Sequence, residues 1–449
     1  MAQVKSYDVL VLGAGIAGLA AARSLAEAGK DVLLLEARAR VGGRVWSVVS
    51  TGLGLPVELG AEFVHGRPPE LWRLIEEAGL RTYELDGRQM CFEDGELKEC
   101  SRSDAFSVLE ELSEDEPDLS FAEWIGQRNV PEDTACATTA FVEGFNAADA
   151  RRIGTAALAK QQKAEDAIEG DRGFRIEDGY SALADFLLKK FDEAGGSLRL
   201  STPVVAVAWQ KGSVRVLVWN NADFETPPFV SDSGWGTHFA ARQCVVTLPL
   251  GVLQAGNVRF DPEPQPAMQA AARLAMGSAR RITCLFRDRF WQERAAEMSF
   301  LFSDEGMVRV WWTPSPQAVP QITGWIGGPR ALAAGLDNSE NFAQAGLRSL
   351  ERIFGERESR LRELLIGWHT HDWQRDPLSL GAYSYAPKGA VDASSAMAEP
   401  VEETLYFAGE HTDTSGHWGT VHGALRSGLR AAAQLLGAKS GGESCHVGS

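Results

Sequence analysis

The sequence predicts an α/β fold that is divided into two domains. Residues 8–12 form a short apolar run that ends at a glycine, which is typical of a buried strand. An alanine- and leucine-rich segment then runs to Ala28 and stops at Gly29, as a helix would. A second apolar run at residues 31–35 completes a strand–helix–strand unit. Because 449 residues are too many for one ordinary hydrophobic core, a second domain is expected.

The turn between the first strand and the helix is rich in glycine. Gly13 permits the tight turn, Gly15 lets a pyrophosphate approach the backbone, and Gly18 allows close packing of helix on strand. The N-terminus of the helix presents N–H groups to a phosphate. Glu36 follows roughly 20 residues later, where a carboxylate can accept hydrogen bonds from a ribose. The unit predicts a Rossmann-like dinucleotide site that is made by Gly13, Gly15, Ile16, Ala17, Gly18 and Glu36.

A second glycine turn follows directly, because residues 36–44 read Glu-Ala-Arg-Ala-Arg-Val-Gly-Gly-Arg. The first turn alone does not separate NAD from FAD. Arginines on both sides of a second turn suit a long, doubly phosphorylated ligand that continues past the first helix. This pattern favours FAD and adds Ala37, Arg38, Gly43 and Arg44 to the predicted binding residues.

Charge and hydropathy exclude two classes of partner. With 44 basic and 61 acidic residues, the formal net charge is −17, which argues against a nucleic-acid-binding surface. The apolar N-terminal segment contains Asp8 and Arg23 and is interrupted by glycines, so it is interpreted as part of the fold and not as a signal peptide. The sequence has no other apolar run of about 18 residues. We therefore expect a soluble, cytoplasmic protein that does not bind membranes.

The cysteines suggest neither a metal site nor a disulfide framework. The six cysteines are scattered and include no CxxC pair. Thiols in this pattern are expected to be reduced and either buried or incidental. No metal is therefore predicted.

The middle of the chain predicts helices and strands in turn. A helix is expected at residues 68–79, and an acidic, irregular and helical region at 80–171. Residues 141–148 fit either a cavity wall or a packed helix end. A helix at 181–194 has Ser181 as its predicted N-cap, and strands follow at 204–209, 214–219 and 244–248. A surface loop is expected at residues 220–237.

Further strands and a long helix are predicted beyond residue 280. Strands are expected at 281–286, 308–312 and 322–326, and a helix at 339–354, which together suggest a sheet with helices on one side. Five tryptophans are expected to be mostly in the core, with some of them lining a cavity: Trp311, Trp312, Trp325, Trp368 and Trp373.

The last third of the chain predicts a second ligand-facing turn. Residues 404–412 read Thr-Leu-Tyr-Phe-Ala-Gly-Glu-His-Thr, which indicates a strand, a turn and then a small-residue helix that ends near 436. Glu410 is expected to bind ribityl hydroxyls. The helix N-terminus near Thr420 is placed to polarise an electron-poor ring. Residues 438–449 are small and polar and are expected to be disordered.

Taken together and in this order, the motifs GxGxxG, GG-Arg, ELGAEFVHG, GAYSY and LYFAGEHT resemble the flavin-containing amine oxidase superfamily over residues 7–436. The resemblance is strongest to the polyamine oxidase and histone lysine demethylase branch, which is related to the monoamine oxidases. It implies a discontinuous Rossmann-like FAD domain of the GR2 type, made by residues 1–67, 179–258 and 378–437. It also implies an inserted α+β substrate domain, residues 68–178 and 259–377, with a mixed sheet flanked by helices.

The same resemblance implies an activity. Members oxidise a primary or secondary amine, polyamines among them, by hydride transfer to flavin. The imine that forms is hydrolysed to an aldehyde and an amine or ammonia, and dioxygen reoxidises the flavin to give hydrogen peroxide. In this family the flavin performs the redox step, and the protein supplies orientation and a dry cavity.

Site residues follow from the matching positions. By resemblance, His65 is a hydrogen-bond partner or proton acceptor beside the amine, and Tyr383 stands before the flavin face. Thr420 replaces the second cage tyrosine of the monoamine oxidases. Ala382 replaces their flavin-linking cysteine, so noncovalent FAD is expected. The remaining implied FAD contacts are Gly60, Ala61, Glu62, Val204, Gly409, Glu410, Thr420 and Val421.

One departure from the family pattern concerns the electron acceptor. Arg281 stands where the family has a lysine that holds a water beside the flavin. Arginine is bulkier and stays protonated, which puts efficient reaction with dioxygen in doubt. Three alternatives therefore remain open: an L-amino-acid oxidase, a flavin amine dehydrogenase, and a non-catalytic flavin-bound interaction module. The sequence leaves the particular amine, the cavity shape and the oligomeric state undetermined.

Overall fold

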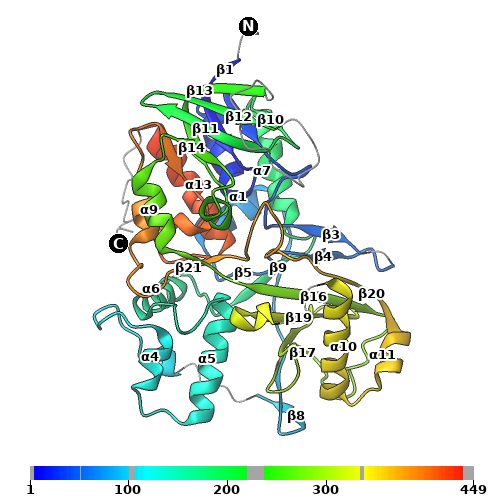
Figure 1. Ribbon diagram of the computed structural model, residues 1–449. Helices are drawn as coiled ribbons and strands as arrows, with labels where there is room; N and C mark the ends of the chain where they lie inside the picture. Colours follow the sequence, from blue (N-terminus) through cyan, green and yellow to red (C-terminus); the bar gives the residue numbers. More distant parts are fainter. Residues whose placement is uncertain (1–4, 51, 101–106, 220–236, 334–337, 438–449) are drawn as a thin grey trace, which may run out of the picture.

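The computed structural model describes residues 5–50, 52–100, 107–219, 237–333 and 338–437. The predicted tail at 438–449 lies outside the described residues, as does the predicted loop except for Thr237, which opens a strand. Figure 1 shows two layered regions, one above the other, with the N-terminus on the upper one. Both regions combine strands with helices, so the α/β class is confirmed.

The upper region is built on an eight-stranded sheet. Its path is β10 (Ser197–Arg199), β2 (Val32–Leu35), β1 (Ser6–Leu12), β13 (Thr237–Val246), β12 (Ser213–Val218), β11 (Val204–Gln210) and β14 (Arg259–Asp261), and β22 (Leu405–Phe407) also pairs with β13. β10, β2, β1, β13 and β22 are parallel neighbours. Because such strands are covered on both faces, Val9 to Leu12 and Leu33 are fully buried.

Three helices cover one face of this sheet: α1 (Ile16–Glu27), α7 (Ser181–Glu193) and α13 (Val421–Leu435). Glycine lets two of them approach closely, since a Cβ on Gly428 of α13 would lie 2.1 Å from the carbonyl oxygen of Ala17. The helices α8 (Leu250–Gln254), α9 (Gln265–Arg273) and α12 (Ala393–Ala398) pack in the core on the opposite face, with the β11–β12 hairpin.

The lower region contains a seven-stranded sheet. Its order is β20 (Leu365–His369), β16 (Ala279–Phe286), β19 (Gln321–Gly327), β18 (Val310–Trp312), β17 (Met298–Ser303), β7 (Arg88–Glu93) and β8 (Glu96–Glu99). α10 (Ser339–Phe354), with the bounds predicted from the sequence, packs Phe342, Leu347 and Leu350 on this sheet. α11 (Glu358–Leu364) lies beside α10, and α4 (Phe121–Gly126), α5 (Glu132–Asn146) and α6 (Thr155–Asp166) form a separate helical group.

Smaller elements join the two regions. β5 (Val64–His65), β9 (Gly173–Ile176) and β6 (Thr82–Glu84) form a three-stranded sheet. The pairs β3 (Ser47–Val49) with β4 (Pro56–Glu58) and β15 (Ala275–Met276) with β21 (Ser384–Tyr385) are short ribbons. The other helices are α2 (Pro69–Glu77), η1 (Gly328–Leu332) and η2 (Glu410–Thr412).

Three predictions about local structure are wrong. The region 80–171 contains β6, β7 and β8, whose strand pairing is nonlocal and leaves little local signal. Ser181 does not cap α7 but is its first residue, and its Oγ accepts a hydrogen bond from Ser47 N at 2.8 Å. Cys91 and Cys100 form a disulfide, because the β7–β8 hairpin brings them together.

The boundary expected at residue 258 falls too early. β14 pairs with β11 in the upper sheet, and Ala267, Ala270 and Ala271 of α9 lie in the same core as that sheet. The chain enters the lower sheet only at β16. Apolar packing of α9 against α12, which is distant in sequence, explains the difference.

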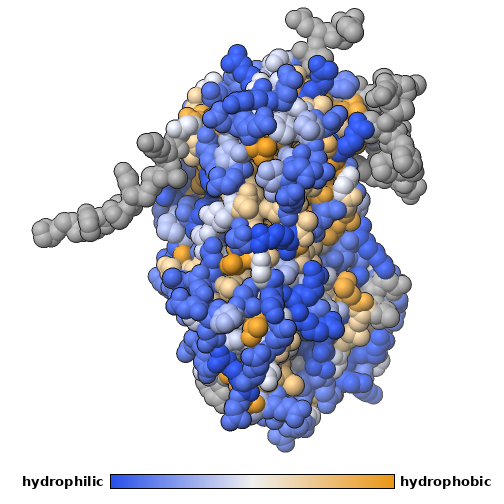
Figure 2. All heavy atoms as spheres, turned by 60° about the vertical axis from the view of Figure 1, so that its left-hand side comes forward, coloured by the Kyte–Doolittle hydropathy of each residue, from blue (hydrophilic) through white to orange (hydrophobic). Residues whose placement is uncertain are grey.

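Hydrophilic residues cover most of the face shown in Figure 2, and apolar residues gather only in small groups. This agrees with the formal charge of −17. Among the described residues, no helix combines the length and apolar character that crossing a membrane requires.

Candidate functional site

A cavity of about 1860 Å³ is lined by residues from both regions. It reaches from the glycine turn after β1 to β16, β18 and β19 of the lower sheet. Ligand pockets for drug-sized molecules are typically about 300–1,000 Å³. The cavity is therefore large enough for a dinucleotide together with a second, smaller molecule.

The glycine turn forms one end of the cavity. Gly13 has φ +101°, and a Cβ on Gly18 would lie 1.9 Å from the carbonyl oxygen of Gly13, so both glycines are required by packing. A Cβ on Gly15 would meet no heavy atom of the described residues within 4 Å, because it would point into the cavity. Gly15 is also the N-cap of α1, and no side chain in the described ranges caps this helix. The uncapped N–H groups and the open space fit the pyrophosphate of FAD.

Glu36 lies at the same end and is nearly buried. Its Oε2 accepts a hydrogen bond from Ala14 N at 2.7 Å, and its Oε1 accepts one from Arg38 N at 2.8 Å. Burial raises the pKa of Glu36, and these hydrogen bonds oppose that effect. The carboxylate thus fixes the turn while still lining the cavity, where lone pairs remain for a ribose.

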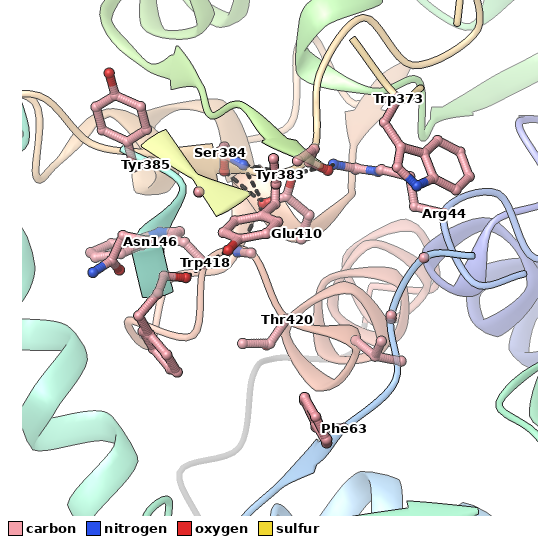
Figure 3. A pocket seen from close by; sticks show the side chains of 18 of the residues that line it. Arg44, Phe63, Asn146, Trp373, Tyr383, Ser384, Tyr385, Glu410, Trp418 and Thr420 are labelled. Carbon is pink, nitrogen blue, oxygen red and sulfur yellow. Dashed lines mark hydrogen bonds and ion pairs between the residues drawn. The ribbon is translucent and has the colours of Figure 1, made fainter. Parts of the chain in front are cut away.

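Glu410 has a structural role that the sequence did not predict. It accepts hydrogen bonds from Arg44 Nη1 at 2.8 Å, Ser384 Oγ at 2.6 Å and Gly419 N at 2.9 Å (Figure 3). Burial opposes ionisation, but Arg44 and Ser384 hold the pKa of Glu410 below its usual range. The predicted contact of Glu410 with ribityl hydroxyls is therefore corrected: this carboxylate mainly joins the segments after β2, before β21 and before α13.

A buried ion-pair cluster lies beneath the cavity. Arg281 Nη2 contacts Glu62 Oε2 at 2.6 Å, and Arg175 Nη2 contacts Glu62 Oε1 at 2.5 Å. Trp312 Nε1 also donates to Glu62 Oε2, at 3.1 Å. Burial works against ionisation of Glu62, but the two arginines hold its pKa below the usual range. Glu62 therefore serves as counter-charge to two buried guanidinium groups.

Arg281 is held tightly by this cluster. Besides the bond to Glu62, its Nη1 donates to the carbonyl oxygen of Gly60 at 2.8 Å, and only 4 % of the residue is exposed. Its Nε has no hydrogen-bond partner among the described residues, and the side chain lines the cavity. The guanidinium is thus an immobile cation beside the Gly60–Ala61 segment.

Tyr383 and Thr420 lie on the same wall of the cavity, with Phe63 beyond Thr420 in the view of Figure 3. The Tyr383 hydroxyl donates to the carbonyl oxygen of Phe145 at 2.6 Å, which fixes the ring, and burial raises its pKa. Thr420 is the N-cap of α13: its Oγ1 accepts from Gly423 N at 3.0 Å. The aromatic ring of Tyr383 is therefore available to the cavity while its hydroxyl is occupied.

His65 lies at the end of β5 and lines the cavity. Its ring makes edge contacts with Phe63, at 6.0 Å between centroids, and with Phe145, at 5.7 Å. Burial lowers the pKa of His65 to about 4. The imidazole is therefore neutral near pH 7 and can accept a hydrogen bond or a proton.

The other predicted residues are distributed as follows. Gly18 packs against Gly13 and does not line the cavity. The remaining predicted residues line it: Gly13, Gly15, Ile16, Ala17, Glu36, Ala37, Arg38, Gly43, Arg44, Gly60, Ala61, Glu62, His65, Val204, Arg281, Tyr383, Gly409, Glu410, Thr420 and Val421.

Aromatic side chains that sequence reasoning left undecided form a wall near Tyr383. Phe63 and Trp312 have ring centroids 5.3 Å apart, and Trp312 and Trp325 are 6.2 Å apart. Trp312, Trp325 and Trp373 line the cavity, whereas Trp311 is fully buried in the core. Residues 141–146 also line it, which decides between the two earlier interpretations of that segment. Period-2 alternation in β18 separates Trp311 from Trp312 and was the available signal.

A carboxyl group unforeseen from the sequence also lines the cavity. Glu165 on α6 has a raised pKa of about 7 because of burial, and its Oε2 has no partner within the described ranges. Ligand atoms of Glu165, His417 and His422 lie within 4.8 Å of one another. However, His417 Nδ1 is 2.9 Å from Arg426 Nη1 and its Nε2 is 3.1 Å from the Ala164 carbonyl oxygen, so His417 offers no ready lone pair to a metal.

Comparison with known proteins agrees with this geometry. The model of the flavin containing amine oxidoreductase family matches residues 16–436. Polyamine oxidase 4 of Oryza sativa subsp. japonica is 29 % identical over 467 residues, which cover 95 % of this chain and 88 % of the relative. Lysine-specific histone demethylase 1 homolog 2 of the same plant is 28 % identical, over 96 % of this chain but only 57 % of its own length.

Solved structures share the fold. A putrescine oxidase bound to putrescine superposes with a TM-score of 0.79 at 20 % identity, covering 97 % of this chain and 100 % of that one. Cyclohexylamine oxidase from Brevibacterium oxydans gives 0.77 at 21 % identity, covering 96 % and 99 %. With its glycine turn, its cavity and a family match over most of its length, the chain belongs to the flavin-containing amine oxidoreductases and is an FAD-dependent enzyme that acts on amines.

Proposed function

We propose that this enzyme oxidises a primary or secondary amine, polyamines among them, by hydride transfer. The observation that carries the proposal is the aromatic wall around Tyr383, which faces neutral His65 across the end of the cavity distal to the glycine turn. When bound, FAD accepts the hydride from the carbon beside nitrogen, so that water converts the resulting imine to an aldehyde and an amine or ammonia. Dioxygen is the proposed acceptor of the electrons, giving hydrogen peroxide.

The side chains prepare the amine for this step. Phe63, Trp312 and Trp325 exclude water from the cavity wall, and a dry environment disfavours the ammonium form of a substrate. Tyr383 presents its ring face to the amine as a cation–π partner, and the bond to Phe145 keeps that face in place. His65 is neutral and accepts a proton or hydrogen bond from the nitrogen.

An anaerobic amine panel tests the proposal. Holoprotein mixed with monoamines, diamines and polyamines should lose its flavin absorbance near-stoichiometrically with at least one of them. Diamines belong in the panel because the Glu165 carboxyl, with a pKa of about 7, ionises near neutral pH within the cavity and can attract a second ammonium group. If no amine bleaches the flavin, amine oxidation is contradicted.

The rival L-amino-acid oxidase is separated by the same assay. Such an enzyme needs a cation for the substrate carboxylate, and Arg281 is already paired with Glu62. We therefore expect each reactive amine to reduce the flavin faster than its α-carboxylated analogue does. The opposite order would favour an amino acid as the substrate.

The fixed position of Arg281 favours a second candidate, an amine dehydrogenase with poor oxygen reactivity. Arg281→Lys should speed flavin reoxidation in air by about tenfold, or ~1.4 kcal/mol of barrier, because the compact ammonium leaves room for a water where the guanidinium lies. Stopped-flow mixing of reduced enzyme with oxygenated buffer measures this rate. The rate of reduction by the amine should stay the same.

Arg280→Lys is the matched control. Arg280 pairs with Asp372 at 2.8 Å and does not line the cavity, so its replacement should change neither rate. A wild-type enzyme that already reoxidises in air as fast as Arg281→Lys would argue against the dehydrogenase.

A further inference from the structure

Asp376 lies just outside the cavity and binds a cavity residue through both carboxylate oxygens. Arg38 Nη1 is 2.9 Å from Asp376 Oδ2, and Arg38 Nη2 donates to Oδ1 at 2.9 Å and to Ser379 Oγ at 3.1 Å. Arg38 lines the cavity next to Glu36, whereas Asp376 does not line it. Any effect of Asp376 on a bound molecule therefore passes through Arg38.

His371 completes the arrangement. Its Nε2 is 2.7 Å from Asp376 Oδ2, and its ring lies between Trp46, at 5.0 Å, and Trp373, at 4.4 Å between centroids. Trp373 in turn donates from Nε1 to the carbonyl oxygen of Leu59 at 2.8 Å. Asp376 is thus held from a second side, and its orientation is fixed independently of Arg38.

A carboxylate fixed in this way restricts the arginine. Arg38 would otherwise lose rotamer freedom on binding an anion, and a bidentate partner removes that loss beforehand. Burial alone would raise the pKa of Asp376, but His371 and Arg38 hold it far below its usual range, so the carboxylate stays ionised. The guanidinium retains further N–H groups for a ligand, since it has five donors.

We propose that Asp376, held by His371, is a positioning residue that orients Arg38 toward the adenosine diphosphate half of FAD. The location supports this half of the cofactor, because Arg38 follows Glu36 and the glycine turn, and not the wall near Tyr383. The inference rests on FAD binding but not on the identity of the amine. It also means that a residue within the predicted substrate segment, 259–377, controls cofactor retention.

The first test measures FAD release from holoprotein after dilution, by recovery of flavin fluorescence. Asp376→Asn should raise the Kd for FAD about tenfold, as expected for loss of a charge-assisted hydrogen bond. Asp372→Asn is the matched control, because it removes a similar ion pair four residues earlier, to Arg280 outside the cavity. The control should retain FAD like the wild type.

The second test separates positioning from a structural defect. The full-length chain after flavin removal is titrated with ADP and with FMN. Asp376→Asn should weaken ADP about tenfold and leave FMN unchanged, whereas a distorted fold would weaken both. In an Arg38→Met background, Asp376→Asn should have no further effect on ADP.

Distinct results overturn the two levels of the argument. If wild-type protein binds neither FAD nor ADP, the cofactor assignment itself fails. If the wild type binds both and Asp376→Asn binds ADP equally well or more tightly, the positioning role is wrong. Equal losses in the Arg38→Met and wild-type backgrounds would also overturn it, because Asp376 would then act independently of Arg38.

Discussion

Replacing Gly15 by valine is expected to abolish FAD binding and to leave the fold intact. A Cβ at this position would meet no heavy atom of the described structure within 4 Å, and the backbone there has φ −72° and ψ 179°, which any L-residue adopts. The new side chain would instead fill the space in front of the N-terminus of α1. A phosphate would then be kept from the N–H groups that would bind it.

The measurement is flavin content after purification, with circular dichroism as the check on folding. Gly126→Ala is the neutral control, since its Cβ also meets nothing within 4 Å but Gly126 does not line the cavity. Gly18→Ala should behave in the opposite way to Gly15→Val and destabilise the protein, because its Cβ would lie 1.9 Å from the Gly13 carbonyl oxygen. A yellow, FAD-saturated Gly15→Val protein would show that the pyrophosphate lies elsewhere.

Removing the Glu62 carboxylate should cause a large loss of stability. Glu62→Ala leaves Arg175 and Arg281 buried without their counter-charge, and breaking a buried pair in this way destabilises by about 3–5 kcal/mol. Of the two arginines, Arg281 is 4 % exposed and Arg175 is 6 % exposed, so water cannot easily replace the carboxylate. Urea denaturation monitored by tryptophan fluorescence measures the change in unfolding free energy.

Glu77→Ala provides the comparison. Glu77 pairs with Arg23 at 2.6 Å on the surface, where its side chain is 40 % exposed, and exposed pairs of this kind contribute about 0–1 kcal/mol. An equal shift in the denaturation midpoint for Glu62→Ala and Glu77→Ala would contradict the view that the buried cluster is a major stabilising feature.

Much of the cofactor end could be predicted because its signals are local. Gly13, Gly15 and Gly18 lie within one turn, and each fulfils a steric requirement that spacing alone reveals. The apolar runs of β1 and β2 predict strands buried on both faces, and both strands are. The amphipathic pattern of α10 also predicted its ends, since helix periodicity depends on neighbours three and four residues apart.

Predictions failed where partners are distant in sequence. The strands β6 and β7 pair with β9 and β17, and so they look irregular from their own residues. Glu410 carries a family motif but binds Arg44, which is 366 positions away. The motif indicates that a carboxylate is needed there, but it does not indicate which group the carboxylate binds.

The sequence by itself determined the dinucleotide turn, the α/β class and the set of residues that line the cavity. Only the tertiary structure decided what those residues do, because their hydrogen bonds and ion pairs connect segments that are far apart. Arg281 and Glu62 are 219 positions apart, and Arg38 and Asp376 are 338 apart. Local patterns record steric and hydrophobic requirements of neighbouring residues, whereas the partner of a buried charge depends on how the whole chain packs.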